Sequence, residues 1–586
     1  MGEHVMEENN PKIFLESVIL IFIFGVIYVA FCGGHYLISP DETRYVGIAW
    51  EMYHNNDFIT PRLSGSPFLG KPILFYWWDI LAYHIFGVND FASRFFPTLI
   101  GAFTSTMAYV YGRIVFSRRM GLLMGFMLAA SPMFYGLTNY ANMDGEIAGW
   151  NACCLFSFLI AVHYLRQDKP ASTWFYLSYF FAALAFLTKG LIGLVFPGMI
   201  IFFWVLLLND WRLLLRIRLI TGLILFLVVI TPWLYLCEKA NPGFLYYFFI
   251  FNQFFRFVGS NFNNQHSFFY FWPIVIVATF PFVLYILQGY WHHIRNYRES
   301  LKENRDSLFI ALWMILVTIF FSIPGGKPLG HIAPALPPAV LLLAMYFNHV
   351  WSKQSSKANQ ISSWCMLVIA FVVGAALLCL PFISNNKHAL EAVPYARFMG
   401  LVMVVCSVLV FLWLKRKAAI SHIVTTFLVM GVLMNMTLVA SLKTFNLQYN
   451  YPIAQVILPY LQKYPNAKVL MVGQYYYALP MYLDRNIGIV YDWKEIKDSD
   501  DADGWPREIY DGVEYIKGHK ESKEMLDYAE LKQAWNQKNQ VVIVVSPISP
   551  GERLDQALGG SSVKQIGFNK RRGAYIYINQ TNEATH

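Results

Sequence analysis

Long apolar segments separated by short polar ones fill the chain up to residue 442, and a more polar stretch follows them. Uncharged segments such as 219–236 and 361–380 are long enough to cross the hydrocarbon core of a bilayer as helices. The pattern predicts thirteen membrane helices: 14–32, 95–113, 120–137, 147–165, 172–188, 191–208, 219–236, 271–290, 308–323, 332–349, 361–380, 396–414 and 421–442. We therefore expect an α-helical polytopic membrane protein.

After residue 442 the apolar runs shorten to strand length. Residues 468–473, 541–545, 510–515 and 574–578 are predicted as strands, and 521–536 as a helix. This alternation is typical of a small α/β domain, so we divide the chain into a membrane domain, 1–442, and a soluble domain, 443–586. Neither a G-x-G-x-x-G nor a P-loop motif follows the predicted strands, and no nucleotide cofactor is expected.

The distribution of charge predicts an orientation in the membrane. The chain is 56% hydrophobic and 14% charged, with a net charge of +9, and its Lys and Arg residues cluster in alternate loops. By the positive-inside rule these loops and the N-terminus are cytoplasmic, so the soluble domain is expected in the periplasm of a bacterium. No basic stripe with interleaved aromatic residues is present, which argues against a nucleic-acid partner.

Residues 35–95 form a long, aromatic loop on the predicted outer side. Pro61, Pro67 and Pro72 interrupt it, so we expect short helices that lie along the membrane surface instead of another crossing.

Two groups of carboxylates lie at predicted outer membrane boundaries. Asp41 and Glu42 follow the first apolar segment, and Asp144 lies where the third and fourth predicted membrane helices meet on the same face. Such groups are candidates for catalysis, for orienting an acceptor or for binding a metal. The alternative is that each aspartate only caps a helix.

Isolated bases also gather on this outer side, where the positive-inside rule disfavours them. Taken singly, they are explained by side chains that reach the membrane surface and by ordinary loop histidines. Taken together, they predict a cavity for an anionic headgroup, and with the carboxylates they suit transfer of a group from a phosphate. The bases are Lys71, Lys189, Arg256, His266, Lys327 and His331.

The order of the motifs around these residues resembles the GT-C glycosyltransferases, in particular the lipid A aminoarabinose transferase and protein mannosyltransferase families. The motifs are P-D-E-x-R-Y at Pro40, K-P at Lys71, Y-A-x-x-D ending at Asp144, L-T-K-G at Lys189, an aromatic-flanked Arg256 followed by His266, and K-x-x-x-H-x-x-P from Lys327. Gly70 replaces a Glu that is common in relatives, and His331 replaces a Tyr.

The resemblance implies an integral-membrane enzyme that moves a sugar, expected to be an amino sugar, from undecaprenyl phosphate to lipid A at the bacterial inner membrane. Asp41, Asp144 and Glu42 would be its catalytic carboxylates, and the six bases would bind the lipid-linked donor. Asp41 is the candidate ligand of a divalent cation. Because Gly70 has no carboxylate, the sequence argues against a metal ligand at position 70.

Two other functions stay open from the sequence. A protein O-glycosyltransferase of the same superfamily would need a general base for a hydroxyl acceptor, and Asp41 would supply it. A transporter of lipid-linked sugars is disfavoured, because no paired repeat is visible and the charges lie at one surface instead of the bilayer midplane.

Overall fold

The computed structural model describes residues 10–255, 265–295, 305–383, 391–445, 449–497, 504–516, 522–537, 539–547, 551–559, 564–569 and 574–579. The chain divides into two compact units. The membrane unit consists of 1–34, 95–230 and 266–445, and the loop–tail unit consists of 35–94, 231–265 and 446–586. The long first loop thus groups with the tail, whereas the domain boundary after residue 442 stays a prediction.

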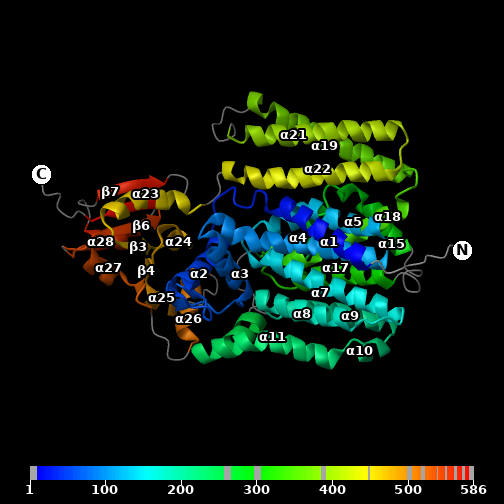
Figure 1. Ribbon diagram of the computed structural model, residues 1–586. Coiled ribbons are helices and arrows are strands. Elements are labelled where there is room, and N and C mark those ends of the chain that lie inside the picture. The colour runs from blue at the N-terminus through cyan, green and yellow to red at the C-terminus, as the bar shows by residue number, and fades with distance from the viewer. Residues whose placement is uncertain are drawn as a thin grey trace. The chain divides into compact units, whose positions relative to one another are not determined.

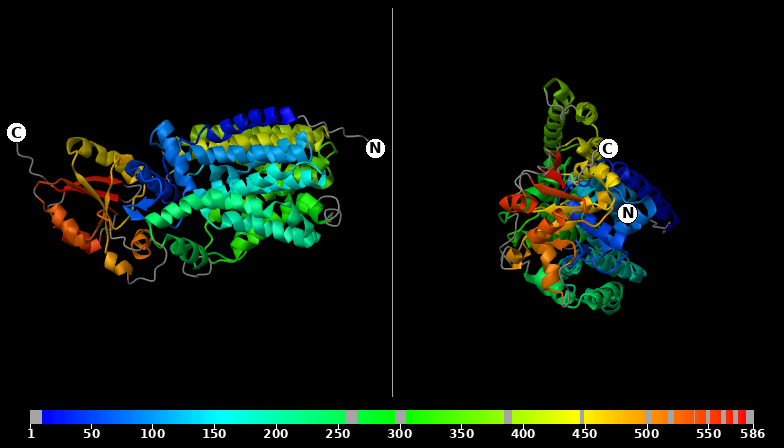
Figure 2. Two further views of the ribbon diagram at one scale, coloured as in Figure 1. Left: turned by 60° about the horizontal axis from the view of Figure 1, so that its bottom comes forward. Right: turned by 90° about the vertical axis from the view of Figure 1, so that its left-hand side faces the viewer.

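The membrane unit is a bundle of helices that run side by side (Figures 1 and 2). At its centre, α7 is buried along every residue from Met143 to Val162, against α8 and α9. Its helices are α1 (Asn10–Val29), α4 (Asp90–Val115), α5 (Arg118–Ala130), α6 (Pro132–Thr138), α7 (Met143–Arg166), α8 (Ser172–Lys189), α9 (Ile192–Leu208), α10 (Arg212–Arg216), α11 (Leu219–Ala240), α14 (Phe271–Val277), α15 (Ile286–Arg295), α17 (Arg305–Ser322), α18 (Leu336–Val350), α19 (Lys357–Ile383), α21 (Val393–Lys415) and α22 (Ile420–Ser441), with 3-10 turns η2 (Val283–Tyr285), η3 (Leu329–Ala335) and η4 (Leu442–Thr444).

Within the described residues, eight helices are long and apolar enough to cross a membrane, or nine if the bent pair α5 and α6 is one span. The predicted class of a polytopic helical protein is confirmed, and the number thirteen stays a prediction. One predicted helix, 271–290, is wrong as a single element, because α14 ends at Val277 and α15 begins at Ile286. Pro281 lies in this break, where a proline removes a backbone donor.

The loop–tail unit carries a six-stranded sheet with the order β5-β4-β3-β6-β8-β7. Strand β3 pairs in parallel with β4 and β6, and β4 pairs in parallel with β5. Strand β8 pairs antiparallel with β6, and β7 pairs antiparallel with β8. Its elements are α2 (Asp41–Asn55), β1 (Arg62–Leu63), β2 (Ser66–Pro67), α3 (Leu74–Phe86), α12 (Phe244–Tyr246), the π-helix η1 (Tyr247–Phe255), α23 (Tyr451–Lys463), β3 (Lys468–Val472), α24 (Leu479–Leu483), β4 (Gly488–Val490), α25 (Trp493–Lys497), α26 (Trp505–Glu514), β5 (Met525–Leu526), α27 (Tyr528–Trp535), β6 (Val542–Pro547), α28 (Gly551–Leu558), β7 (Lys564–Asn569) and β8 (Ala574–Ile578).

The predicted α/β character of the tail is confirmed, and β3, β6 and β8 fall where strands were predicted. The predicted strand at 510–515 is wrong, because these residues belong to helix α26. Pro506 starts this helix, and Arg507 forms an ion pair with Asp511 one turn later. Helix-spaced Trp505, Ile509 and Gly512 face inward.

Candidate functional site

Asp144 and Lys189 form an ion pair in the membrane unit. Asp144 lies in the first turn of α7, and Lys189 is the last residue of α8, so both charges are favourable to the helix dipoles. The side chains are only 11% and 10% exposed. Asn142 is the residue that caps α7, since its side chain accepts a hydrogen bond from the Asp144 backbone N–H at 2.8 Å. The Asp144 carboxylate is therefore not the helix cap that the sequence left open.

The Gly/Pro-rich turn before α18 reaches the same carboxylate. At Gly330 a side chain would collide with the carboxylate of Asp144, so the backbone of η3 passes directly beside it. The next residue, His331, places its ring 5.3 Å from that of Phe321. Asp144, Lys189 and the Gly330–His331 backbone thus come from three separate segments, and they form the group that we call the Asp144 cluster.

Lys327 and His266 meet at the start of the same turn. The Lys327 ammonium is buried and donates to the backbone carbonyl of His266 at 2.9 Å and to that of Pro324. Burial lowers the pKa of Lys327 from its ordinary value. The His266 ring is exposed and stacks on Tyr270 with 3.9 Å between the ring centroids. Lys327 therefore ties the turn to residue 266 in this structure, and contact with a donor phosphate stays a prediction.

In the loop–tail unit, Asp41 begins α2 and its side chain is 51% exposed. The N-cap of this helix is Pro40, so Asp41 is not a capping residue either. Arg44, one turn later, places Nη2 3.4 Å from Asp41 Oδ1. An exposed carboxylate at the start of a helix, with a guanidinium beside it, is accessible to an incoming polar group.

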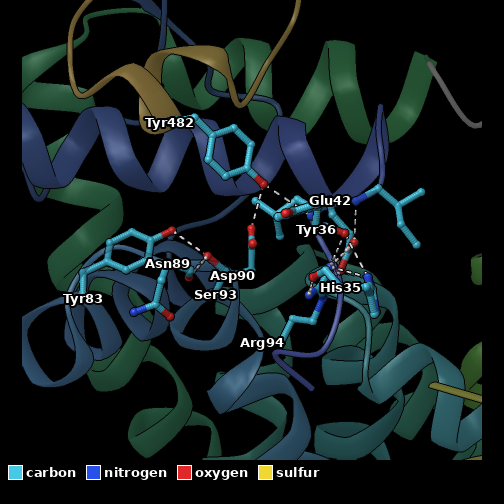
Figure 3. Close-up of polar contacts among 11 residues, drawn as sticks. His35, Tyr36, Glu42, Tyr83, Asn89, Asp90, Ser93, Arg94 and Tyr482 are labelled. Atoms are coloured by element: carbon cyan, nitrogen blue, oxygen red, sulfur yellow. Dashed lines mark hydrogen bonds and ion pairs between the residues drawn. The ribbon is translucent and has the colours of Figure 1, made fainter. Parts of the chain in front are cut away.

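Glu42 has a different environment, because it is fully buried against Arg94 (Figure 3). Arg94 donates from Nε to Glu42 Oε1 at 2.6 Å and from Nη2 to Oε2 at 2.7 Å, and the Ile38 backbone N–H also donates to Oε2 at 2.7 Å. Arg94 Nη1 donates to the His35 carbonyl at 2.8 Å. These contacts indicate a structural role for Glu42, and its catalytic role stays a prediction. The sequence signal that was missed is one arginine, Arg94, in the apolar run that begins α4.

His35 and Asp90 complete this buried network (Figure 3). Burial, followed by the adjacent Arg94 charge, lowers the pKa of His35 to about 4. Tyr482 of the tail donates to Asp90 at 2.7 Å, and burial raises the pKa of Asp90. The network therefore connects the loop with the tail inside one unit.

Lys71 precedes α3 and is half-buried. A side chain at its neighbour Gly70 would meet the side-chain amide of Asn252 in η1, so a larger residue there would require Asn252 to move. Arg256 lies outside the described residues. Within the described ones, no group of three or more His, Cys, Asp or Glu side chains is placed to hold a metal ion.

Comparisons with known proteins agree with this picture. Residues 70–236 match the family model described as dolichyl-phosphate-mannose-protein mannosyltransferase. The undecaprenyl phosphate-alpha-4-amino-4-deoxy-L-arabinose arabinosyl transferase of Pectobacterium atrosepticum is 27% identical over 379 residues, which are 64% of this chain and 66% of that protein. Arabinosyl transferase 1 of Sodalis glossinidius is 28% identical over 61% of this chain and 65% of its own length. The matched region thus spans slightly less than two thirds of these relatives.

The crystal structure of ArnT from Cupriavidus metallidurans bound to undecaprenyl phosphate superposes with a TM-score of 0.80. It is 22% identical and covers 97% of this chain and 99% of its own. Its apo state gives a TM-score of 0.74 over 97% and 98%. The predicted resemblance to the aminoarabinose transferase and mannosyltransferase families is confirmed, and so is the GT-C type of fold.

Proposed function

We propose that this chain is an integral-membrane glycosyltransferase that moves an amino sugar from undecaprenyl phosphate to lipid A. The Asp144 cluster is the observation that carries the proposal, because a carboxylate and an ammonium at 10–11% exposure beside a Gly/Pro-rich turn suit a phosphate-linked sugar. The names of the relatives and the undecaprenyl phosphate bound in the ArnT crystal structure support the same donor. The reaction would take place at the outer face of the bacterial inner membrane, with the N-terminus in the cytoplasm and the tail in the periplasm.

In the proposed reaction an acceptor oxygen attacks the anomeric carbon of the sugar, and the bond between that carbon and the phosphate oxygen breaks with inversion. The departing undecaprenyl phosphate keeps the bonding electron pair. Lys71, Arg256 and Lys327 would stabilise its growing charge, which is commonly the largest contribution to such catalysis. Lys189 would hold the Asp144 carboxylate in place until the sugar-bearing donor arrives, and His266 and His331 would border the donor.

Asp41 would orient the acceptor. A lipid A phosphate is already anionic and needs no general base, so Asp41 would contact the amine of the sugar or a cation. Among the described residues Asp41 does not belong to a group of three or more His, Cys, Asp or Glu side chains, so a cation beside it would need further ligands from the substrates.

The second candidate is transfer to a hydroxyl of an exported protein, and the description of the matching family model favours it. Here Asp41 would have to remove the hydroxyl proton, so Asp41→Asn would abolish transfer. Transfer to a lipid A phosphate should retain measurable activity in this variant.

Mass spectrometry of lipid A from cells with the gene, without it and with Asp41→Asn tests both candidates. Loss of one amino-sugar mass in the deletion strain, with partial retention in the variant, is the expected result. Unchanged lipid A in the deletion strain, together with loss of a glycan from exported proteins, would overturn the lipid A assignment.

A further inference from the structure

Helix α26 of the tail touches each of the loop–tail segments that lead to candidate donor-site residues. Glu508 contacts α2, whose first residue is Asp41. Gly512 packs against the Pro67 carbonyl so closely that no side chain fits, and Pro67 lies four residues before Lys71. Asp511 accepts a hydrogen bond at 3.0 Å from Tyr247 in η1, the segment that ends just before Arg256.

The contact with α2 is the one that reaches a candidate catalytic group. Arg44 donates from Nη1 to Glu508 Oε1 at 2.5 Å, while its Nη2 lies 3.4 Å from Asp41 Oδ1. One guanidinium therefore joins both carboxylates. Glu508 and Arg44 are mostly covered, with side-chain exposures of 18% and 21%, whereas Asp41 is half exposed. A rigid pair of this kind fixes where the more mobile carboxylate lies.

Glu508 is itself held in place. Tyr477, also of the tail, donates to Glu508 Oε2 at 3.3 Å, and Arg44 lies 5.1 Å from the centre of the Tyr45 ring. The orientation of Arg44 is thus determined by contacts on both sides. Without Glu508, the guanidinium would lose its short hydrogen bond and keep the weaker one to Asp41.

We propose that Glu508 is a positioning residue, through which the tail fixes Arg44 and so the carboxylate of Asp41. This inference rests on the proposed function and gives the tail a role in it. The residues that we propose to bind the donor are others. Loss of the Glu508 charge should therefore slow the transfer step and leave donor binding almost unchanged.

The test is Glu508→Gln in the full-length protein, assayed with a synthetic undecaprenyl phosphate-linked amino sugar and purified lipid A. We expect kcat to fall about tenfold with KM for the donor within twofold, and Glu508→Asp to recover part of the loss. Glu514→Gln on the same helix is the matched control, because it removes a 2.5 Å contact to Arg507 and does not touch Arg44. Equal effects of Glu508→Gln and Glu514→Gln would overturn the proposal.

The double substitution Arg44→Glu with Glu508→Arg separates positioning from simple attachment of the tail. It restores an ion pair between α2 and α26 but places a carboxylate beside Asp41. We expect thermal stability to return and kcat to stay low. Recovery of both would show that Arg44 only anchors the tail and would contradict the positioning role.

Hydrogen exchange decides the question even if the wild-type chain transfers no sugar. Glu508→Gln should raise amide exchange at the start of α2, residues 41–45, whereas Glu514→Gln should not. An inactive wild type with this exchange pattern would overturn the proposed function alone. Unchanged exchange in Glu508→Gln would overturn the positioning role, whatever the activity.

Discussion

Each unit contains a buried ion pair, and the two pairs are built differently. In the loop–tail unit, Arg94 and Glu42 are both fully buried, and two nitrogens of Arg94 donate hydrogen bonds to the two carboxylate oxygens of Glu42. Backbone groups of Ile38 and His35 make further hydrogen bonds with the pair. In the membrane unit, Lys189 and Asp144 join one ammonium to one oxygen at about a tenth exposure. The Arg94 pair keeps its hydrogen bonds within the fold, whereas in the proposed mechanism the Lys189 pair would exchange its partner for the donor.

This difference separates a charge that maintains the fold from one that is available for chemistry. Removing one partner of a buried pair in which a guanidinium makes two hydrogen bonds to a carboxylate is costly, because the other partner would be left as a buried unpaired charge. An ammonium on a flexible stem adjusts to a phosphate by a small rotation. Burial is therefore a poor guide to function unless the hydrogen-bonding capacity already used is counted as well.

The largest expected effect comes from breaking the Arg94 pair. Arg94→Met should destabilise the protein by about 3–5 kcal/mol, because the buried Glu42 carboxylate loses its partner. The apparent melting temperature in detergent should fall by at least about 5 °C. Arg62→Met is the control, since its 3.3 Å pair with Asp57 is more exposed and should contribute about 1 kcal/mol or less. Equal melting temperatures for the two variants would contradict the distinction.

Asp144→Asn should show the opposite pattern, with activity lost and stability kept. The amide is nearly the same shape but no longer pairs with Lys189, so we expect transfer to fall by about 100-fold or more. The apparent melting temperature should change by less than about 3 °C, because the pair is partly exposed. Activity above half of the wild-type rate would remove Asp144 from the proposed mechanism.

Gly330→Ala tests the role of the Asp144 side chain without changing a charge. Its methyl group would displace the Asp144 side chain, and we expect transfer to fall about tenfold, equivalent to about 1.4 kcal/mol in the barrier. Gly325→Ala in the same turn is the matched control, because its methyl group would meet nothing within 4 Å. If steady-state rates of the two variants agree, the close approach at Gly330 has no role in catalysis.

Glu51 is a third buried carboxylate, and it accepts a 2.7 Å hydrogen bond from the Gly65 backbone N–H. Burial raises the pKa of Glu51 from 4.5 to about 7. The folded state therefore holds this proton more tightly, and its stabilising contribution is complete below pH 4.5 and lost as the pH rises through about 7.

Glu51→Gln removes the titration and should be more stable than the wild type at pH 8 by about 3 kcal/mol, and within about 1 kcal/mol of it at pH 5. Melting temperatures of both proteins at the two pH values provide the measurement. A difference that does not depend on pH would show that Glu51 is not the group that titrates.

The sequence predicted those features that depend on neighbours along the chain. Apolar runs located the helices of the bundle and strands β3, β6 and β8, and the isolated charges identified both Asp144 and Lys189 as candidates. It did not predict that these two residues pair across 45 positions, or that Arg94 binds Glu42 across 52. Helix α26 was missed because Tyr510 and Tyr515 favour a strand locally, while its inward face is defined by tertiary contacts.

The contact between Arg44 and Glu508 can form only late in the synthesis of the protein. The two residues are separated by 464 positions, so at a synthesis rate of roughly 5–20 residues per second Glu508 emerges roughly 20 to 90 seconds after Arg44. Until then Arg44 has no Glu508 to bind, even though most of the bundle and α24 already exist. A stop codon before residue 505 should therefore yield an inserted membrane protein that lacks the contact between Arg44 and Glu508, a defect that a measurement of protein abundance alone would overlook.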